Sequence, residues 1–153
     1  MSEIRWCILF AGLLLPALTD ILFMSIEGRF VIAECIAAVC MDCICGLSFQ
    51  EVAISLAPGM ILWILSCLSK GIGMGDVMTV FFIGLVSGWN VTMNIVFLGS
   101  IGCLVAQLVL NASVKIKRKT QVHYKSEFAF IPCLLIASFI IWLAKTENII
   151  NLI

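Results

Sequence analysis

The sequence predicts an all-α, polytopic membrane protein of about six transmembrane helices. Hydrophobic residues make up 63% of the 153 residues, charged residues only 12%, and the mean hydropathy is +1.19. These values lie outside the range of soluble globular proteins. A spanning helix takes about 20 mostly apolar residues, so such spans fill the chain. We therefore expect one transmembrane domain over residues 1–153 and no separate soluble domain.

Six apolar segments are separated by charges, glycines and polar clusters. They cover residues 6–23, 30–49, 52–68, 77–89, 95–110 and 128–144. The first segment has no small-residue cleavage site after it, so we interpret it as a retained helix and not as a signal peptide. Only the polar run of residues 89–94 separates the fourth segment from the fifth, and joining the two would give five helices.

The distribution of basic residues predicts the orientation in the membrane. Cytoplasmic loops of membrane proteins are enriched in Lys and Arg. With six spans and the amino terminus outside, seven of the nine basic residues fall on the cytoplasmic side. These seven are Arg29, Lys70, Lys115, Lys117, Arg118, Lys119 and Lys125. We therefore expect a multi-pass protein of the inner or plasma membrane.

Two aspartates occupy matching positions in this topology. Asp20 lies near the inner end of the first segment and Asp76 at the inner start of the fourth. Two carboxylates that meet cannot both ionise cheaply, so they share a proton. Such a pair can activate water against a peptide carbonyl, and Asp20 and Asp76 are our candidate catalytic residues. The alternative is that each is a solvated interfacial carboxylate, with Asp20 ending its helix.

Three alternating glycines precede Asp76, at positions 71, 73 and 75. Glycine lets the backbone approach another chain closely and adopt torsions that other residues avoid. Gly73 and Gly75 are therefore candidate substrate-binding residues beside Asp76. A flexible loop without a role in binding would have the same composition.

Two further carboxylates occur in the second segment. Asp42 lies roughly 18 Å from the inner surface by the helical rise, too deep to pair with Asp76. Glu34 lies only about 6 Å inside by the same measure. Glu34 is either a third carboxylate of the site or a residue of helix packing.

Neither the eight cysteines nor the basic residues at 115–119 indicate a cofactor or a nucleic-acid partner. Most of the cysteines are scattered in apolar segments, where cysteine acts as a small hydrophobe. Cys40 and Cys43 have a metal-like spacing, but a structural zinc site takes four ligands. Residues 115–119 are rich in Lys and Arg, which is typical of a cytoplasmic loop that contacts anionic membrane lipids. We expect no bound metal and no organic cofactor.

Three parts of the sequence together resemble the prepilin peptidases, the G-x-G-D class of intramembrane aspartyl proteases. Gly73-Met74-Gly75-Asp76-Val77 is similar to the catalytic segment at the start of that family's fourth helix. Asp20 is similar in position to the other catalytic aspartate. Residues 128–132, Phe-Ala-Phe-Ile-Pro, are similar to a late segment of the family. The chain resembles the short form, without the amino-terminal domain associated with methylation.

The resemblance implies an aspartic endopeptidase acting at the cytoplasmic membrane face. Its substrate would be a type IV prepilin-like or Flp-type membrane precursor, and its leader peptide would be removed. The resemblance leaves the oligomeric state open. The alternative is a small non-enzymatic transporter or a pilus or secretion assembly subunit with ion-binding carboxylates, in which Asp42 would be the sensitive residue. A related G-x-G-D enzyme acting on another membrane peptide is a third possibility.

Overall fold

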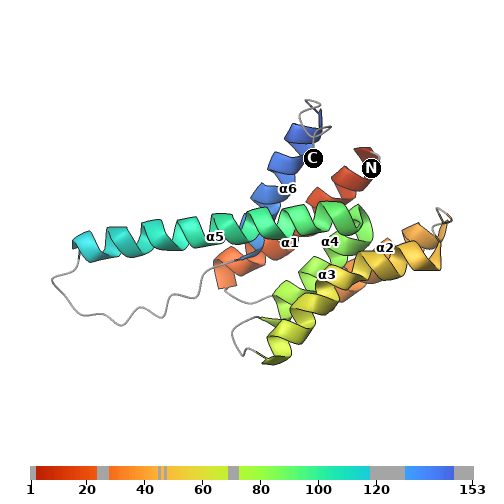
Figure 1. The fold of residues 1–153 in the computed structure, drawn as a ribbon, viewed down its shortest axis with the longest axis horizontal. Coiled ribbons are helices and arrows are strands. Elements are labelled where there is room, and N and C mark those ends of the chain that lie inside the picture. Colours follow the sequence, from red (N-terminus) through yellow and green to blue (C-terminus); the bar gives the residue numbers. More distant parts are fainter. Residues whose placement is uncertain are drawn as a thin grey trace.

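The computed structural model describes residues 3–23, 28–44, 46, 48–68, 73–117 and 130–146, without the side chains of residues 23, 28, 43, 44 and 110–117. Over these residues the fold is all-α, as predicted, with six helices and no strand (Figure 1). The helices are α1 (Glu3–Phe23), α2 (Gly28–Ile44), α3 (Phe49–Leu68), α4 (Met74–Ser87), α5 (Trp89–Lys117) and α6 (Ile131–Thr146).

Helix α4 is the centre of the fold. It packs against α1, α2, α3 and α5. A continuous run of its residues from Phe82 to Val86 is buried, as are Val77, Thr79 and Val80. The segment is apolar on all sides, which is typical of a helix that neighbours surround. Because α4 begins at Met74, its first turn carries Asp76 into this arrangement.

Helices α1 and α6 lie side by side and run in opposite directions. Trp142, near the end of α6, donates a hydrogen bond from Nε1 to Glu3 at the start of α1 (3.4 Å). Ile131, at the start of α6, contacts Asp20 near the end of α1. The amino-terminal end of α1 and the carboxyl-terminal end of α6 are accordingly close to each other in Figure 1.

In the described part of the chain, three helices are long and apolar enough to cross a membrane: residues Glu3–Leu22 of α1, all of α3, and Trp89–Val109 of α5. Large apolar side chains lie exposed on the surface, among them Phe97 (70% exposed). These features are compatible with a membrane environment. Helices α4 and α6 have 14 and 16 residues, or about 21 and 24 Å at 1.5 Å per residue. Both are shorter than the roughly 30 Å hydrocarbon core, so six crossings remain a prediction.

A single residue, Gly88, separates α4 from α5. Its φ is +79° and its ψ is 170°, a combination that essentially only glycine adopts, and its N–H donates to the Gly84 carbonyl (2.8 Å). The hydroxyls of Ser87 and Thr92 hydrogen-bond across the turn (2.9 Å). We had expected a break over residues 89–94, but this run forms the first turns of α5. Its polar residues indicated a break, but a helix tolerates asparagines on an exposed face.

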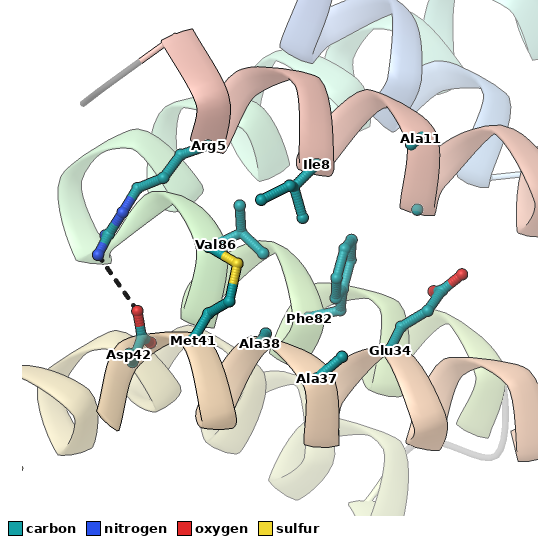
Figure 2. Close-up of a pocket in the computed structure, with 11 residues that line it drawn as sticks. Arg5, Ile8, Ala11, Glu34, Ala37, Ala38, Met41, Asp42, Phe82 and Val86 are labelled. Atoms are coloured by element: carbon teal, nitrogen blue, oxygen red, sulfur yellow. Dashed lines mark hydrogen bonds and ion pairs between the residues drawn. The ribbon is translucent and has the colours of Figure 1, made fainter. Parts of the chain in front are cut away.

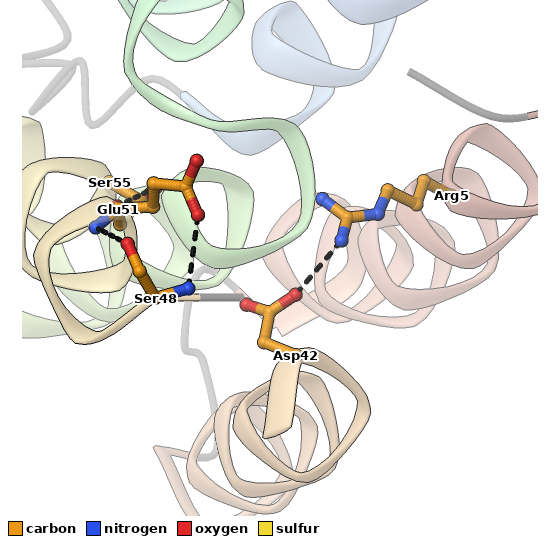
Figure 3. A network of polar contacts seen from close by, with 5 residues as sticks. All are labelled: Arg5, Asp42, Ser48, Glu51 and Ser55. Atoms are coloured by element: carbon orange, nitrogen blue, oxygen red, sulfur yellow. Dashed lines mark hydrogen bonds and ion pairs between the residues drawn. The ribbon is translucent and has the colours of Figure 1, made fainter. Parts of the chain in front are cut away.

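Helix α3 begins with a capping box (Figure 3). The Glu51 N–H donates to Ser48 Oγ (3.3 Å), and the Ser48 N–H donates to Glu51 Oε2 (3.0 Å). This reciprocal pair satisfies two backbone donors that a helix start otherwise leaves free. The box accounts for the start of α3 at Phe49, three residues before the predicted boundary.

Helix α5 is longer than predicted at both ends. It has 29 residues and reaches Lys117, so the basic run begins within the helix. Its carboxyl-terminal half extends beyond the other helices in Figure 1. Arg118, Lys119 and Lys125 lie outside the described residues.

Candidate functional site

Asp20 lies in the last turn of α1 and is 7% exposed. Its Oδ2 accepts a hydrogen bond from the backbone N–H of Ile131 (3.2 Å), and the backbone N–H of Phe130 is a second donor. Both donors belong to the start of α6, where the first N–H groups of a helix have no partner within the helix. The positive end of the helix dipole favours an anion there. Asp20 therefore has a fixed position between α1 and α6.

Asp76 is the third residue of α4 and is anchored to Gly73, the residue that precedes the helix. The Asp76 N–H donates to the Gly73 carbonyl (3.1 Å), and the Gly73 N–H hydrogen-bonds the Asp76 carboxylate. A Cβ atom at Gly73 would lie 3.3 Å from Asp76 Oδ2, closer than ordinary van der Waals contact. Glycine at this position thus leaves the carboxylate free of a side-chain neighbour. Gly75 is part of the first turn, and Gly71 lies outside the described residues.

The structure brings Asp20 and Asp76 together. Their carboxylates are close enough for the charge of one to act on the other, although they come from helices far apart in the sequence. Asp20 is buried and Asp76 is half-buried. Each carboxylate is oriented by backbone N–H groups, so neither depends on a flexible side chain for its position. Two carboxylates within electrostatic range of each other disfavour ionisation of both, so one of them can keep a proton while the other is charged.

Two cysteines that sequence reasoning treated only as packing residues border the pair. The thiols of Cys103 on α5 and Cys133 on α6 hydrogen-bond each other, and they lie within range of the charges of Asp76 and Asp20 respectively. They are far apart in the sequence, so no spacing rule could have placed them here. Among the described residues, no group of three His, Cys, Asp or Glu side chains is placed to hold a metal ion. The side chains of Cys43 and Cys45 fall outside that set.

Asp42 lies at the other end of the helices. It is 5% exposed, and its Oδ1 forms an ion pair with Arg5 Nη2 at 3.2 Å (Figure 3). Arg5 precedes Asp20 on α1 by about 22 Å at the helical rise. Asp42 therefore has a counter-charge of its own, remote from Asp20 and Asp76.

We expect Arg5→Gln to lower the free energy of unfolding by about 1 kcal/mol. Glutamine keeps a hydrogen-bond donor near Asp42 but removes the charge, and the guanidinium of Arg5 is partly exposed, which limits the loss. Thermal unfolding of the purified protein in detergent would measure the change. Lys145→Gln is a matched control on the surface of α6, and we expect it to leave stability unchanged. Equal unfolding temperatures for the two variants would contradict a stabilising role for the pair.

Comparisons with protein-family models, with curated protein sequences and with solved structures found no significant match.

Proposed function

We propose that this protein is an intramembrane aspartyl endopeptidase that removes the leader peptide of type IV prepilin-like or Flp-type precursors. One observation carries the proposal. The Asp20 carboxylate interacts with the charge of Asp76 and also accepts the Ile131 N–H. The three sequence segments that resemble the prepilin peptidases are thus represented in one cluster by Asp20, Asp76 and residues 130–132. Phe128 and Ala129 lie outside the described residues.

The reaction follows from two carboxylates that share one proton. The ionised carboxylate takes a proton from water, and the resulting hydroxide bonds to the carbonyl carbon of the scissile peptide. The protonated carboxyl donates its proton to the carbonyl oxygen, which gives a neutral tetrahedral species. As the C–N bond breaks, the carboxyl that took its proton from water gives that proton to the nitrogen, which leaves as an amine. The other carboxylate takes a proton from one hydroxyl of the tetrahedral species, so the pair again holds one proton. The products are a carboxylic acid on the leader and a new amino terminus.

The surroundings of Asp76 support an extended peptide as the substrate. Gly73 is exposed and Gly75 is half-buried, and neither has a side chain to occupy the space beside Asp76. A peptide backbone can approach glycine more closely than any other residue. In the proposed orientation, this end of α4 faces the cytoplasm, where a short basic leader would meet the membrane.

A cleavage assay and an ion-flux assay on the same protein test the proposal. The probe is a synthetic peptide with a lysine-rich leader, a glycine and a 20-residue apolar segment. Wild type in lipid vesicles should cut this peptide once, at the border of the leader, and mass spectrometry would identify the two products. Asp42→Asn should cut it at a rate within about twofold of wild type, since asparagine still accepts a hydrogen bond from Arg5.

The non-enzymatic alternative gives the opposite pattern. If the protein is a transporter with ion-binding carboxylates, wild-type vesicles should show proton or cation flux, Asp42→Asn should abolish that flux, and the peptide should remain intact. That result would refute the peptidase.

A further inference from the structure

A groove of about 450 Å³ opens between α1 and α2, with α4 as its floor (Figure 2). Helix α1 contributes Ile8, Ala11 and Gly12, and α4 contributes Phe82 and Val86. Most of the lining is apolar. Figure 2 shows the ion pair of Arg5 and Asp42 at one end and Glu34 at the other.

The groove depends on small residues at its walls. A Cβ atom at Gly12 would overlap the ring of Phe82, so alanine at position 12 would require the Phe82 ring to move. On the α2 side, Ala37 and Ala38 leave the space open. Glu34 lies one helical turn before Ala38, so α2 contributes the carboxylate at this end of the groove.

Glu34 has an oxygen that no protein group satisfies. Its Oε2 is buried, and it has no hydrogen-bond partner in the part of the chain that the structure describes. A buried acceptor without a partner costs about 1–3 kcal/mol, more if it is charged. Buried polar atoms without a partner are rare in folded proteins, so this oxygen marks a position where a hydrogen-bond donor is missing.

The Glu34 end of the groove lies at the level of the first turns of α4. The neighbouring residue, Cys35, places its Sγ 3.9 Å from the carbonyl oxygen of Met78. Met78 follows Asp76 on α4 by two residues, which is about 3 Å along the helix axis. Neither Asp20 nor Asp76 lines the groove, so the groove is separate from the candidate catalytic site, and Glu34 marks the end of the groove that is nearer to Asp76 along α4.

We propose that this groove binds the apolar segment of the substrate next to the scissile bond, and that Glu34 accepts a hydrogen bond from a polar side chain on that segment. The proposal rests on the proposed function for the identity of the occupant. The apolar walls fit a hydrophobic helix face, and the free Glu34 oxygen fits a donor. A lipid acyl chain would fit the walls but has no donor for Glu34. Glu34 is thus a specificity-determining residue.

Photo-crosslinking tests the groove without requiring cleavage. The protein carries Asp76→Asn, and a benzophenone amino acid replaces Ala37 in the groove or Ala53 on α3. Both alanines are exposed, and Ala53 does not line the groove. The probes are the peptide described above with an all-leucine apolar segment, and a set that carries one glutamine at each of its first eight positions.

We expect the peptide to crosslink at position 37 and not at position 53. At least one glutamine peptide should bind up to about tenfold more tightly than the all-leucine peptide, which is the effect of one hydrogen bond. Glu34→Leu should remove this preference, whereas Glu34→Gln, which keeps an acceptor oxygen, should retain part of it. Binding of the all-leucine peptide should stay the same in every variant, which also shows that each variant is folded.

Equal crosslinking at positions 37 and 53, crosslinking of position 37 to lipid alone, or no preference for any glutamine peptide would overturn the proposal. Failure of the proposed function looks different. In that case the peptide would crosslink in the groove with the expected preference, but the protein without Asp76→Asn would leave it uncut.

Discussion

Replacing either Asp20 or Asp76 with asparagine should abolish peptide cleavage, with a loss of at least about 10³-fold in kcat, while the protein remains folded. Acid–base groups contribute about 10²–10⁴-fold, and asparagine can neither take nor give the proton. Asparagine does keep an acceptor oxygen for the N–H groups of Ile131 and Gly73, which hold the two carboxylates. The structural role of each side chain is thereby preserved. Rates of product formation in vesicles, with thermal unfolding in parallel, would check both statements.

The double variant gives a sharper result. Residues that act as one catalytic unit lose activity non-additively, so Asp20→Asn with Asp76→Asn should be no slower than either single variant. If the two aspartates acted independently, the two losses would multiply.

A further variant separates the chemistry of Asp20 from its capping of α6. Asp20→Ala removes both functions, so it should lower the free energy of unfolding by about 1 kcal/mol relative to Asp20→Asn, with the same loss of activity. If Asp20→Asn retained cleavage and only Asp20→Ala lost it, Asp20 would be a helix cap and not a catalytic residue.

Helix content and order could be predicted from hydropathy because a long apolar segment has few other structures available. The boundaries were less predictable. The end of α4 depends on the positive φ of Gly88, and the start of α3 depends on hydrogen bonds between Ser48 and Glu51. A serine followed three residues later by glutamate was visible in the sequence and would have placed the start of α3. The polarity of residues 89–94 was misleading because Asn90 and Asn94 lie exposed within a helix, and the break lies just before this run, at Gly88.

The nearness of Asp20 and Asp76 was predicted from the expected topology, in which two helices, α2 and α3, lie between them and both aspartates come to the same membrane face. The hydrogen-bond donors that hold Asp20 could not be predicted from the sequence. Ile131 contributes a backbone N–H, and a backbone group carries no signature of its own in a sequence. Glu34 could be placed near the site by counting residues, but its lack of a partner depends on how α1 and α2 are separated above α4. That separation is a property of three packed helices.

Gly84→Ala should lower the free energy of unfolding by about 1–3 kcal/mol, which is typical of overpacking in a well-packed core. Gly84 lies in the buried part of α4. A Cβ atom there would collide with the backbone carbonyl oxygen of Ser55 on α3, and the Ser55 carbonyl carbon would be 3.3 Å away. A backbone group cannot rotate aside as a side chain can. The two helices would have to separate, and small residues are what allow helices in membranes to approach so closely.

The matched control is Gly102→Ala on α5, where a Cβ atom would meet no other atom within 4 Å. Alanine is favoured over glycine within a helix by about 1 kcal/mol, so this variant should be as stable as wild type or more stable. Thermal unfolding in detergent would compare the two substitutions. Because α4 also carries Asp76, Gly84→Ala should slow cleavage as well, whereas Gly102→Ala should not. If both variants unfolded at the wild-type temperature, the close approach of α3 to α4 would not be a determinant of stability.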